Sequence, residues 1–244
     1  MRALMMIVLL LGGGFGWTVH TLRTARIQRA AVAAIEAAGG YVFYDCDRDT
    51  NRIVTVPMPT HHKWMPRGQK LAALRRPSRV GNDCFNRVIE IVLPDVLTDD
   101  GLALVGRCPR VEKIWHATPS RWVTDAGLAH LDGLASLKAL DLSRSDITDA
   151  GLVHLKGMNS LERLDLSRTR ITDAGLVHLR GLTRLQTLGL RSTDVGKAGV
   201  VHLKALTNLR SLDLCGTDVD ESAAQELRTA LPNASILVKP IWEM

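Results

Sequence analysis

The chain has 244 residues, and its 31 lysines and arginines outnumber its 25 aspartates and glutamates, which gives a formal net charge of +6. Its composition is that of a folded globular protein, poor in aromatic residues, which excludes a disordered or low-complexity chain. The four cysteines show no CxxC spacing and have no histidine at zinc-finger distance, so they provide no metal site: Cys46, Cys84, Cys108 and Cys215. Cys46 and Cys84 could pair if the protein lay outside the cytoplasm, whereas isolated buried thiols are the commoner arrangement.

Residues 3–19 contain no charged side chain and predict one membrane-spanning helix, within an anchor at residues 1–22. The run is at the short end of the roughly 17–25 residues that cross a bilayer as a helix. Trp17 stands where an interfacial aromatic residue is expected. A secretory signal peptide is the alternative, but the following residues offer no convincing pair of small residues for cleavage. We expect a single-pass membrane protein.

The charges that flank this run indicate its orientation. Arg23, Arg26 and Arg29 follow it, whereas only Arg2 and the amino group of Met1 precede it. Because the more positive flank stays in the cytoplasm, we expect the rest of the chain to face the cytoplasm.

Residues 23–95 are expected to form a juxtamembrane helix and an N-terminal cap. The alanine-rich stretch 21–40 predicts a helix that continues the anchor and stops at Gly39 and Gly40. Two strands are predicted, YVFYDC from Tyr41 and RVIEIVL from Arg87, and the long loop between them contains four prolines.

That loop contains a basic stretch with no acidic residue between residues 50 and 82: Arg52, Lys63, Arg67, Lys70, Arg75, Arg76 and Arg79. Beside a membrane anchor such a stretch favours anionic lipid headgroups, whereas on a soluble protein it would favour nucleic acid. A solvated loop is the simpler alternative. With an anchor at residues 1–22, lipid contact is the interaction we consider, and we expect no nucleic acid.

Residues 96–220 contain a unit that repeats every 24 residues. VTDAGLAHLDGLASLKALDLSRSD begins at Val123, similar units begin at Ile147 and Ile171, and a divergent one begins at Val195. Leucines in the order LxxLxL predict a short strand with its leucines inside, and TDAGLVHL predicts a helical turn that its threonine caps. Since stacked turns pair their strands, we expect an α/β solenoid with a parallel, concave sheet and outer helices.

Both ends of the array depart from the unit. Val96 and Val111 begin degenerate first turns, and His116 stands where later turns have a leucine, so we expect it to form a hydrogen bond. Residues 221–244 are expected to be a C-terminal cap, with a helix from Glu221 to Leu231 and a strand in PNASILVK.

The residues between the inward leucines are expected to form a protein-binding concave face: Trp115, Lys138, Asp141, Arg144, Arg163, Asp165, Arg168, Arg191 and Asp213. Trp115 would be the hydrophobic anchor, and the charges would set register. Asp141 and Asp165 have the spacing of paired catalytic carboxylates, about 5–5.5 Å in retaining glycosidases. Because the pair arises from the repeat on an open sheet, structural ion pairing is the preferred interpretation.

A column of histidines also follows the repeat: His130, His154, His178 and His202. No carboxylate or cysteine recurs at matching positions, so we interpret them as solvated surface residues and not as metal ligands. The sequence contains no phosphate loop, nucleophile pair or cleft-forming motif. We therefore expect no catalytic activity and no cofactor.

The unit (I/V)TDAGLxHLxGLxxLxxLDLSxT resembles the leucine-rich repeats of planctomycete-type bacteria, whose members also begin with an apolar segment, arginines and an AIxxxGG step, here residues 34–40. The resemblance implies an interaction solenoid without catalytic residues. The repeats also resemble the substrate-reading half of F-box ubiquitin-ligase adaptors, but no F-box helix bundle fits between residues 20 and 95. We expect a non-catalytic, membrane-anchored protein that binds another protein, with such an adaptor as the alternative.

Overall fold

The computed structural model of the chain describes residues 26–37, 41–44, 88–93, 98–116 and 123–238. The predicted anchor, the basic stretch, Cys46 and Cys84 lie outside the described residues and stay predictions. The predicted domain boundaries likewise stay predictions.

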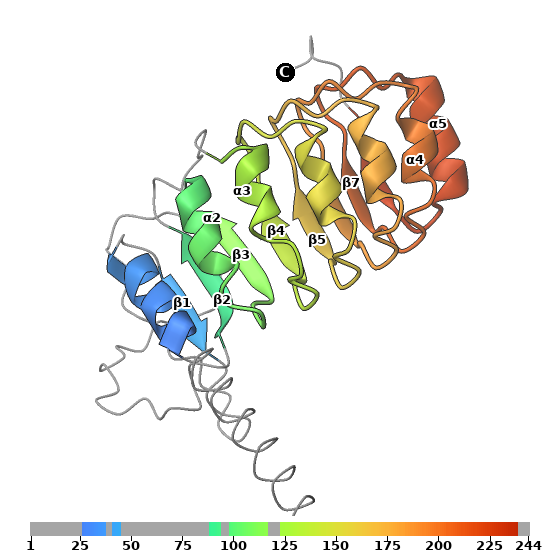
Figure 1. Cartoon of the computed structure of the whole chain (residues 1–244). Helices are drawn as coiled ribbons and strands as arrows, with labels where there is room; N and C mark the ends of the chain where they lie inside the picture. Colours follow the sequence, from blue (N-terminus) through green and yellow to red (C-terminus); the bar gives the residue numbers. More distant parts are fainter. Residues whose placement is uncertain (1–25, 38–40, 45–87, 94–97, 117–122, 239–244) are drawn as a thin grey trace, which may run out of the picture.

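One sheet of eight strands runs through the described part of the chain, and the strands follow one another in chain order (Figure 1). β1 pairs antiparallel with β2, and every later pair is parallel. The strands are β1 (Tyr41–Tyr44), β2 (Val88–Leu93), β3 (Lys113–His116), β4 (Ala139–Asp141), β5 (Arg163–Asp165), β6 (Thr187–Gly189), β7 (Ser211–Asp213) and β8 (Ser235–Leu237). This sheet confirms the predicted repeat solenoid.

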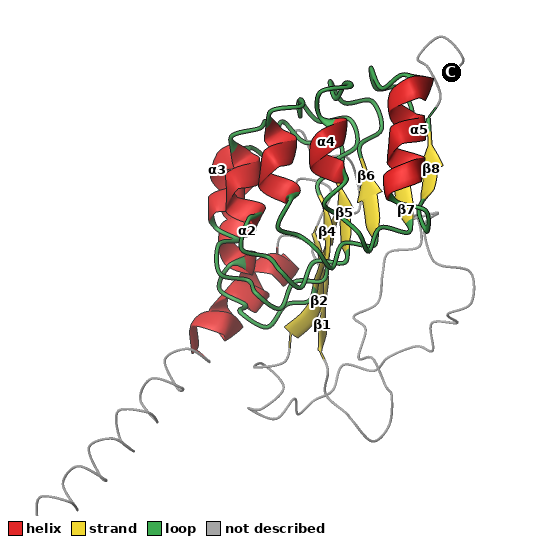
Figure 2. Ribbon diagram, turned by 90° about the vertical axis from the view of Figure 1, so that its right-hand side faces the viewer, coloured by secondary structure: helices red, strands yellow, loops and turns green. Residues whose placement is uncertain are grey.

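The helices of the array lie on one face of this sheet (Figure 2). They are α2 (Asp99–Val105), α3 (Asp125–Ala129), η2 (Gly151–Leu155), η3 (Gly175–Leu179), α4 (Val200–Leu203) and α5 (Glu221–Ala230), where η marks a 3-10 helix. A further helix covers residues 26–37, within the stretch predicted to be helical. The C-terminal helix and strand are also confirmed, since α5 ends at Ala230 with Leu231 as its C-cap, and β8 follows it.

The leucines fill the space between sheet and helices, as their spacing predicts. Leu140, Leu164 and Leu188 are Cα partners in neighbouring strands and are each 1% exposed. At the N-terminal end, Val42 of β1 and Ile91 of β2 continue this buried row. Val32 and Ile35 of the first helix join the same core, so the N-terminal segments are part of the folded array.

Neighbouring turns are also joined on the helical side by an aspartate of one turn and a threonine of the next. Thr148 donates its N–H (2.8 Å) and its hydroxyl (2.6 Å) to the carboxylate of Asp125. The same two bonds join Thr124 to Asp99 and Thr172 to Asp149. In each case the threonine oxygen also accepts from the N–H two residues later, as at Ala150. At Thr124 this bond caps α3, as predicted, whereas η2 and η3 begin three residues after their threonines and have no side-chain cap.

The glycine of the TDAG motif provides the space for this contact. A Cβ at Gly175 would lie 2.9 Å from Cγ of Asp149 and 3.1 Å from a methyl carbon of Leu152. Gly127, Gly151 and Gly199 meet the aspartate of the preceding turn in the same way. The TDAG motif thus forms a joint between neighbouring turns: its threonine donates, the aspartate of the preceding turn accepts, and its glycine leaves space for that aspartate.

The last joint in the array is incomplete. Gly196 stands where the other turns have threonine, and it donates only its N–H to Asp173, at 2.6 Å. A second, buried column of hydroxyls bonds within the turns and not between them: Ser145, Thr169, Thr193 and Thr217 each donate to the carbonyl three residues earlier. No threonine hydroxyl of this kind is left without an acceptor, which would be costly in a core.

Replacing Gly175 by alanine is expected to lower the free energy of unfolding by about 1–3 kcal/mol, because the new methyl group overpacks against Asp149. Gly157→Ala is the matched control, since nothing lies within 4 Å of a Cβ there. Urea unfolding of the full chain, followed by circular dichroism, measures both changes. Equal midpoints for the two variants would contradict the joint.

Candidate functional site

The open face of the sheet is the face opposite the helices, and among the described residues no helix covers it (Figure 2). We number each turn from its first leucine, so that Leu137, Leu161, Leu185 and Leu209 are position one. Positions four and six are buried leucines. Positions three and five flank position four in each strand and therefore point to the other side, and position two directly precedes the strand. They build the open face.

The N-terminal end of this face contains the predicted anchor residue. Trp115 lies in β3 and is half-buried, and its Cα partner is Val92 of β2, which pairs in turn with Tyr41 of β1. Ile114, the residue before it, is buried in the core. The structure therefore places Trp115 on the open face, in the position-five row that continues through Asp141 and Asp165.

Two lysines of the open face are already paired with carboxylates of neighbouring turns. Lys138 Nζ lies 2.8 Å from Glu112 Oε2, and Lys113 Nζ lies 3.4 Å from Glu90 Oε2. Exposed ion pairs of this kind contribute about 0–1 kcal/mol. The predicted binding residue Lys138 thus lies on the expected face, but its charge is compensated within the array.

The position-five aspartates cap the turns that follow their strands. Asp141, Asp165 and Asp213 each accept, through Oδ1, from the N–H two residues later at 2.9 Å. Within the described residues, no arginine forms an ion pair with Asp165 or Asp213, so their structural role is hydrogen bonding to the backbone. Although Asp141 and Asp165 are Cα partners, this bonding explains them without catalysis.

Arg144 and Arg168 occupy a turn position with left-handed backbone. Their φ angles are 60° and 59°, and the same position has φ 54° at Ser192 and 71° at Gly216. The N–H of each arginine donates to a carbonyl of the next turn at 2.7 Å, which fixes the turn. Both side chains are exposed. Two guanidinium groups are thus presented at the end of the strands by a backbone conformation that costs free energy for a residue other than glycine.

The remaining predicted residues lie in the same region. Arg163 is exposed at position three, between its Cα partners Ala139 and Thr187. Arg191 is half-buried in the turn after β6. The structure therefore places all nine predicted residues on the open face or in the turns along its edge.

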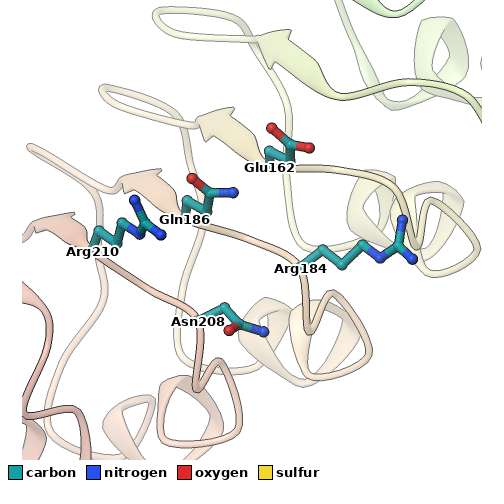
Figure 3. Close-up of a pocket in the computed structure, with 5 residues that line it drawn as sticks. All are labelled: Glu162, Arg184, Gln186, Asn208 and Arg210. Atoms are coloured by element: carbon teal, nitrogen blue, oxygen red, sulfur yellow. The ribbon is translucent and has the colours of Figure 1, made fainter.

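The sequence interpretation missed a hollow of about 300 Å³ beside this face (Figure 3). Its lining is polar and comes from three successive turns: Glu162, Arg184, Gln186, Asn208 and Arg210. The residues at these positions differ from turn to turn, and this departure from the repeat is the one feature of the sequence that could have indicated the hollow.

The histidine column lies on the helical side. His154 Nδ1 lies 3.2 Å from both carboxylate oxygens of Asp132, in the preceding turn, and the residue is half-buried. Within the ranges that the structure describes, no three histidine, cysteine, aspartate or glutamate side chains are grouped to hold a metal ion.

None of the helices in the described ranges has both the length and the apolar character needed to cross a bilayer. The predicted spanning residues 3–19 lie outside those ranges.

Residues 129–195 match the family model described as leucine rich repeat. The following three are among the solved structures that are similar to the chain. An internalin of Listeria monocytogenes has 22% identity and a TM-score of 0.49, covering 59% of this chain and 38% of its own. Internalin C2 of the same organism has 18% identity and a TM-score of 0.39, covering 62% and 81%. A leucine-rich repeat protein of Leptospira interrogans has 19% identity and a TM-score of 0.46, covering 63% and 38%.

The chain thus spans about two fifths of the length of two of these three proteins. No protein of curated function matches its sequence. Residues 129–195, which the family model matches, lie within the stacked strands of a solenoid like that of leucine-rich repeats. Proteins with such arrays generally bind other proteins, and the array's planctomycete-type assignment stays a prediction.

Both described cysteines are buried. Burial raises the pKa of the Cys108 thiol from its ordinary 9.0 to about 11. At pH 8 its thiolate fraction is therefore expected to be roughly a hundredfold below that of an exposed cysteine.

Iodoacetamide at pH 8 is expected to leave Cys108 unmodified in the folded chain and to alkylate it in urea, as peptide mass spectrometry measures. Because burial favours the neutral thiol, the folded-state reaction should accelerate as the pH approaches 11. Alkylation at equal rates with and without urea would contradict the buried position.

Proposed function

We propose that this protein is a non-catalytic interaction protein that binds a protein partner across the open face of its leucine-rich repeats. The observation that carries the proposal is the pair of exposed arginines, Arg144 and Arg168, held outward in left-handed turns beside the open face. Left-handed backbone is uncommon for residues other than glycine, and such strain tends to be retained where a function needs it. Trp115, half-buried on the same face, would be the apolar anchor.

The test removes the two charges without disturbing the turns. Asparagine tolerates left-handed backbone better than most residues, so Arg144→Asn with Arg168→Asn is expected to keep the fold. Proteins captured by the full chain from its own cells are quantified by mass spectrometry for the original and variant chains. Removing two exposed charges from a binding surface is expected to reduce capture of the partner about tenfold or more at low salt.

The matched control is Lys156→Gln with Arg180→Gln, which removes the same charge from exposed residues on the helical side. A partner that is lost with the open-face variant and kept with the control supports the proposal. If every captured protein behaved identically with both variants, the open face would not be the binding surface.

We also propose that residues 3–19 anchor the protein in a membrane, with the repeats in the cytoplasm. The uncharged run and the arginines that follow it support this proposal. The full chain is expected in the membrane fraction and a chain lacking residues 1–22 in the soluble fraction. Protease added to intact cells should leave cytoplasmic repeats undigested.

Digestion of the repeats would place them outside the cell. If both chains were soluble, the anchor would be wrong and the ubiquitin-ligase adaptor would become the better interpretation. The adaptor would use the same open face, so the arginine variants do not distinguish the two, whereas fractionation does.

A further inference from the structure

The hollow beside β5, β6 and β7 brings together side chains from two rows of the array. Glu162, Gln186 and Arg210 are the position-two residues of three successive turns, and Arg184 and Asn208 precede the first leucine of their turns. In Figure 3 the guanidinium groups of Arg184 and Arg210 lie on opposite sides, with Glu162, Gln186 and Asn208 between them. The hollow is thus a polar site with a positive group at each side.

The backbone holds this arrangement in place. The N–H of Gln186 donates to the carbonyl of Glu162 at 2.7 Å, and the N–H of Arg210 donates to the carbonyl of Gln186 at 2.8 Å. Asn208 Nδ2 donates to the carbonyl of Thr183 at 2.6 Å, which fixes its amide and leaves Oδ1 as an acceptor. The spacing of the side chains is therefore set by the stacked turns.

The charges of the hollow have no partners within the described array. Glu162, Arg184 and Arg210 form no side-chain hydrogen bond or ion pair with another described residue. The same position-two row behaves differently at its N-terminal end, where Lys138 pairs with Glu112. In the position-two row, the charges are therefore paired near the N-terminal end and unpaired at the hollow.

Two guanidinium groups against one carboxylate leave the hollow with an excess positive charge, and exposed Arg163 lies next to Glu162. We propose that this hollow receives an acidic peptide segment of the protein partner, with carboxylates bound by Arg184 and Arg210. The proposal rests on the proposed function, since it assumes a protein partner on this side of the array.

A carboxylate is the anion that we propose for this lining, and a phosphate is the alternative that the test distinguishes. Arg guanidinium groups bind carboxylates through paired N–H donors, and the amides of Gln186 and Asn208 add neutral hydrogen-bonding groups. A phosphate group carries close to two negative charges, which would increase both its attraction to the two guanidinium groups and its repulsion from the carboxylate of Glu162. The carboxylate could come from acidic side chains or from a chain end, because both present the same group.

The test uses the full chain in detergent and four fluorescent heptapeptides of glycine and serine. The first contains two glutamates and a capped C-terminus, and the second replaces them with glutamines. The third is the glutamine peptide with a free C-terminal carboxylate, and the fourth contains two phosphoserines. Fluorescence anisotropy at low salt measures their binding.

The glutamate peptide is expected to bind more tightly than its glutamine counterpart. Arg184→Gln and Arg210→Gln should each weaken it about threefold or more, and the double variant about tenfold, because each removes a charge-assisted contact. Glu162→Gln should tighten it about two- to threefold, because it removes a like charge. Lys156→Gln with Arg180→Gln lowers the net charge as much as the double variant and should leave binding unchanged.

Three outcomes would each overturn the proposal. The glutamate and glutamine peptides could bind equally, the control could weaken binding as much as the double variant, or no peptide could bind at about 1 mM. Tighter binding of the phosphoserine peptide through Arg184 and Arg210 would overturn the choice of carboxylate. Binding of the third peptide as tightly as the first supports a chain end as the source. If the peptides fail while the Arg144 and Arg168 variant still loses a partner, only the hollow is refuted.

Discussion

The bond from each threonine to the aspartate of the turn before it is the contact on which the array depends. Leucines pack in any of several registers, because hydrophobic contact has no direction, whereas a carboxylate that receives both an N–H and a hydroxyl fixes one turn on the next. The glycine beside it removes the only atom that would obstruct this contact, as at Gly175 and Asp149. Thus three small residues on the helical side hold in register the strands that form the open face.

Because the bonds between turns lie on the helical side, the residues of the open face can differ from turn to turn. Position two is a glutamate, a lysine, a glutamate, a glutamine and an arginine in successive turns, while positions four and six stay apolar in the turns that follow Val123. The face consequently has two halves of different electrostatic character. Near Trp115 the charges pair with one another, and toward Arg184 and Arg210 they do not.

The LxxLxL spacing was enough to predict the strands and the burial of Leu140 and Leu164, because both follow from the period of a strand. The outer helical turns were predicted from the TDAGLVHL pattern. The spacing of residues did not predict that Asp165 caps a turn or that Arg168 has left-handed backbone. Both depend on the path of the backbone between the strand and the next helical turn. Gly216, at the same turn position as Arg168, was the one hint of left-handed backbone. The sequence did not predict the hollow because its lining residues belong to different turns and come together only when the turns stack.

The joint between turns also limits how such an array can change in length. Every Asp–Thr bond joins a turn only to the adjacent turn. An extra turn with the same TDAG motif could therefore form these bonds with the turn before it and the turn after it, because its glycine leaves the same space. An insertion that is not a multiple of 24 residues would misalign the joint and the leucines together. Gain or loss of DNA in whole repeat units is therefore the route by which this protein would widen or narrow its binding surface in evolution.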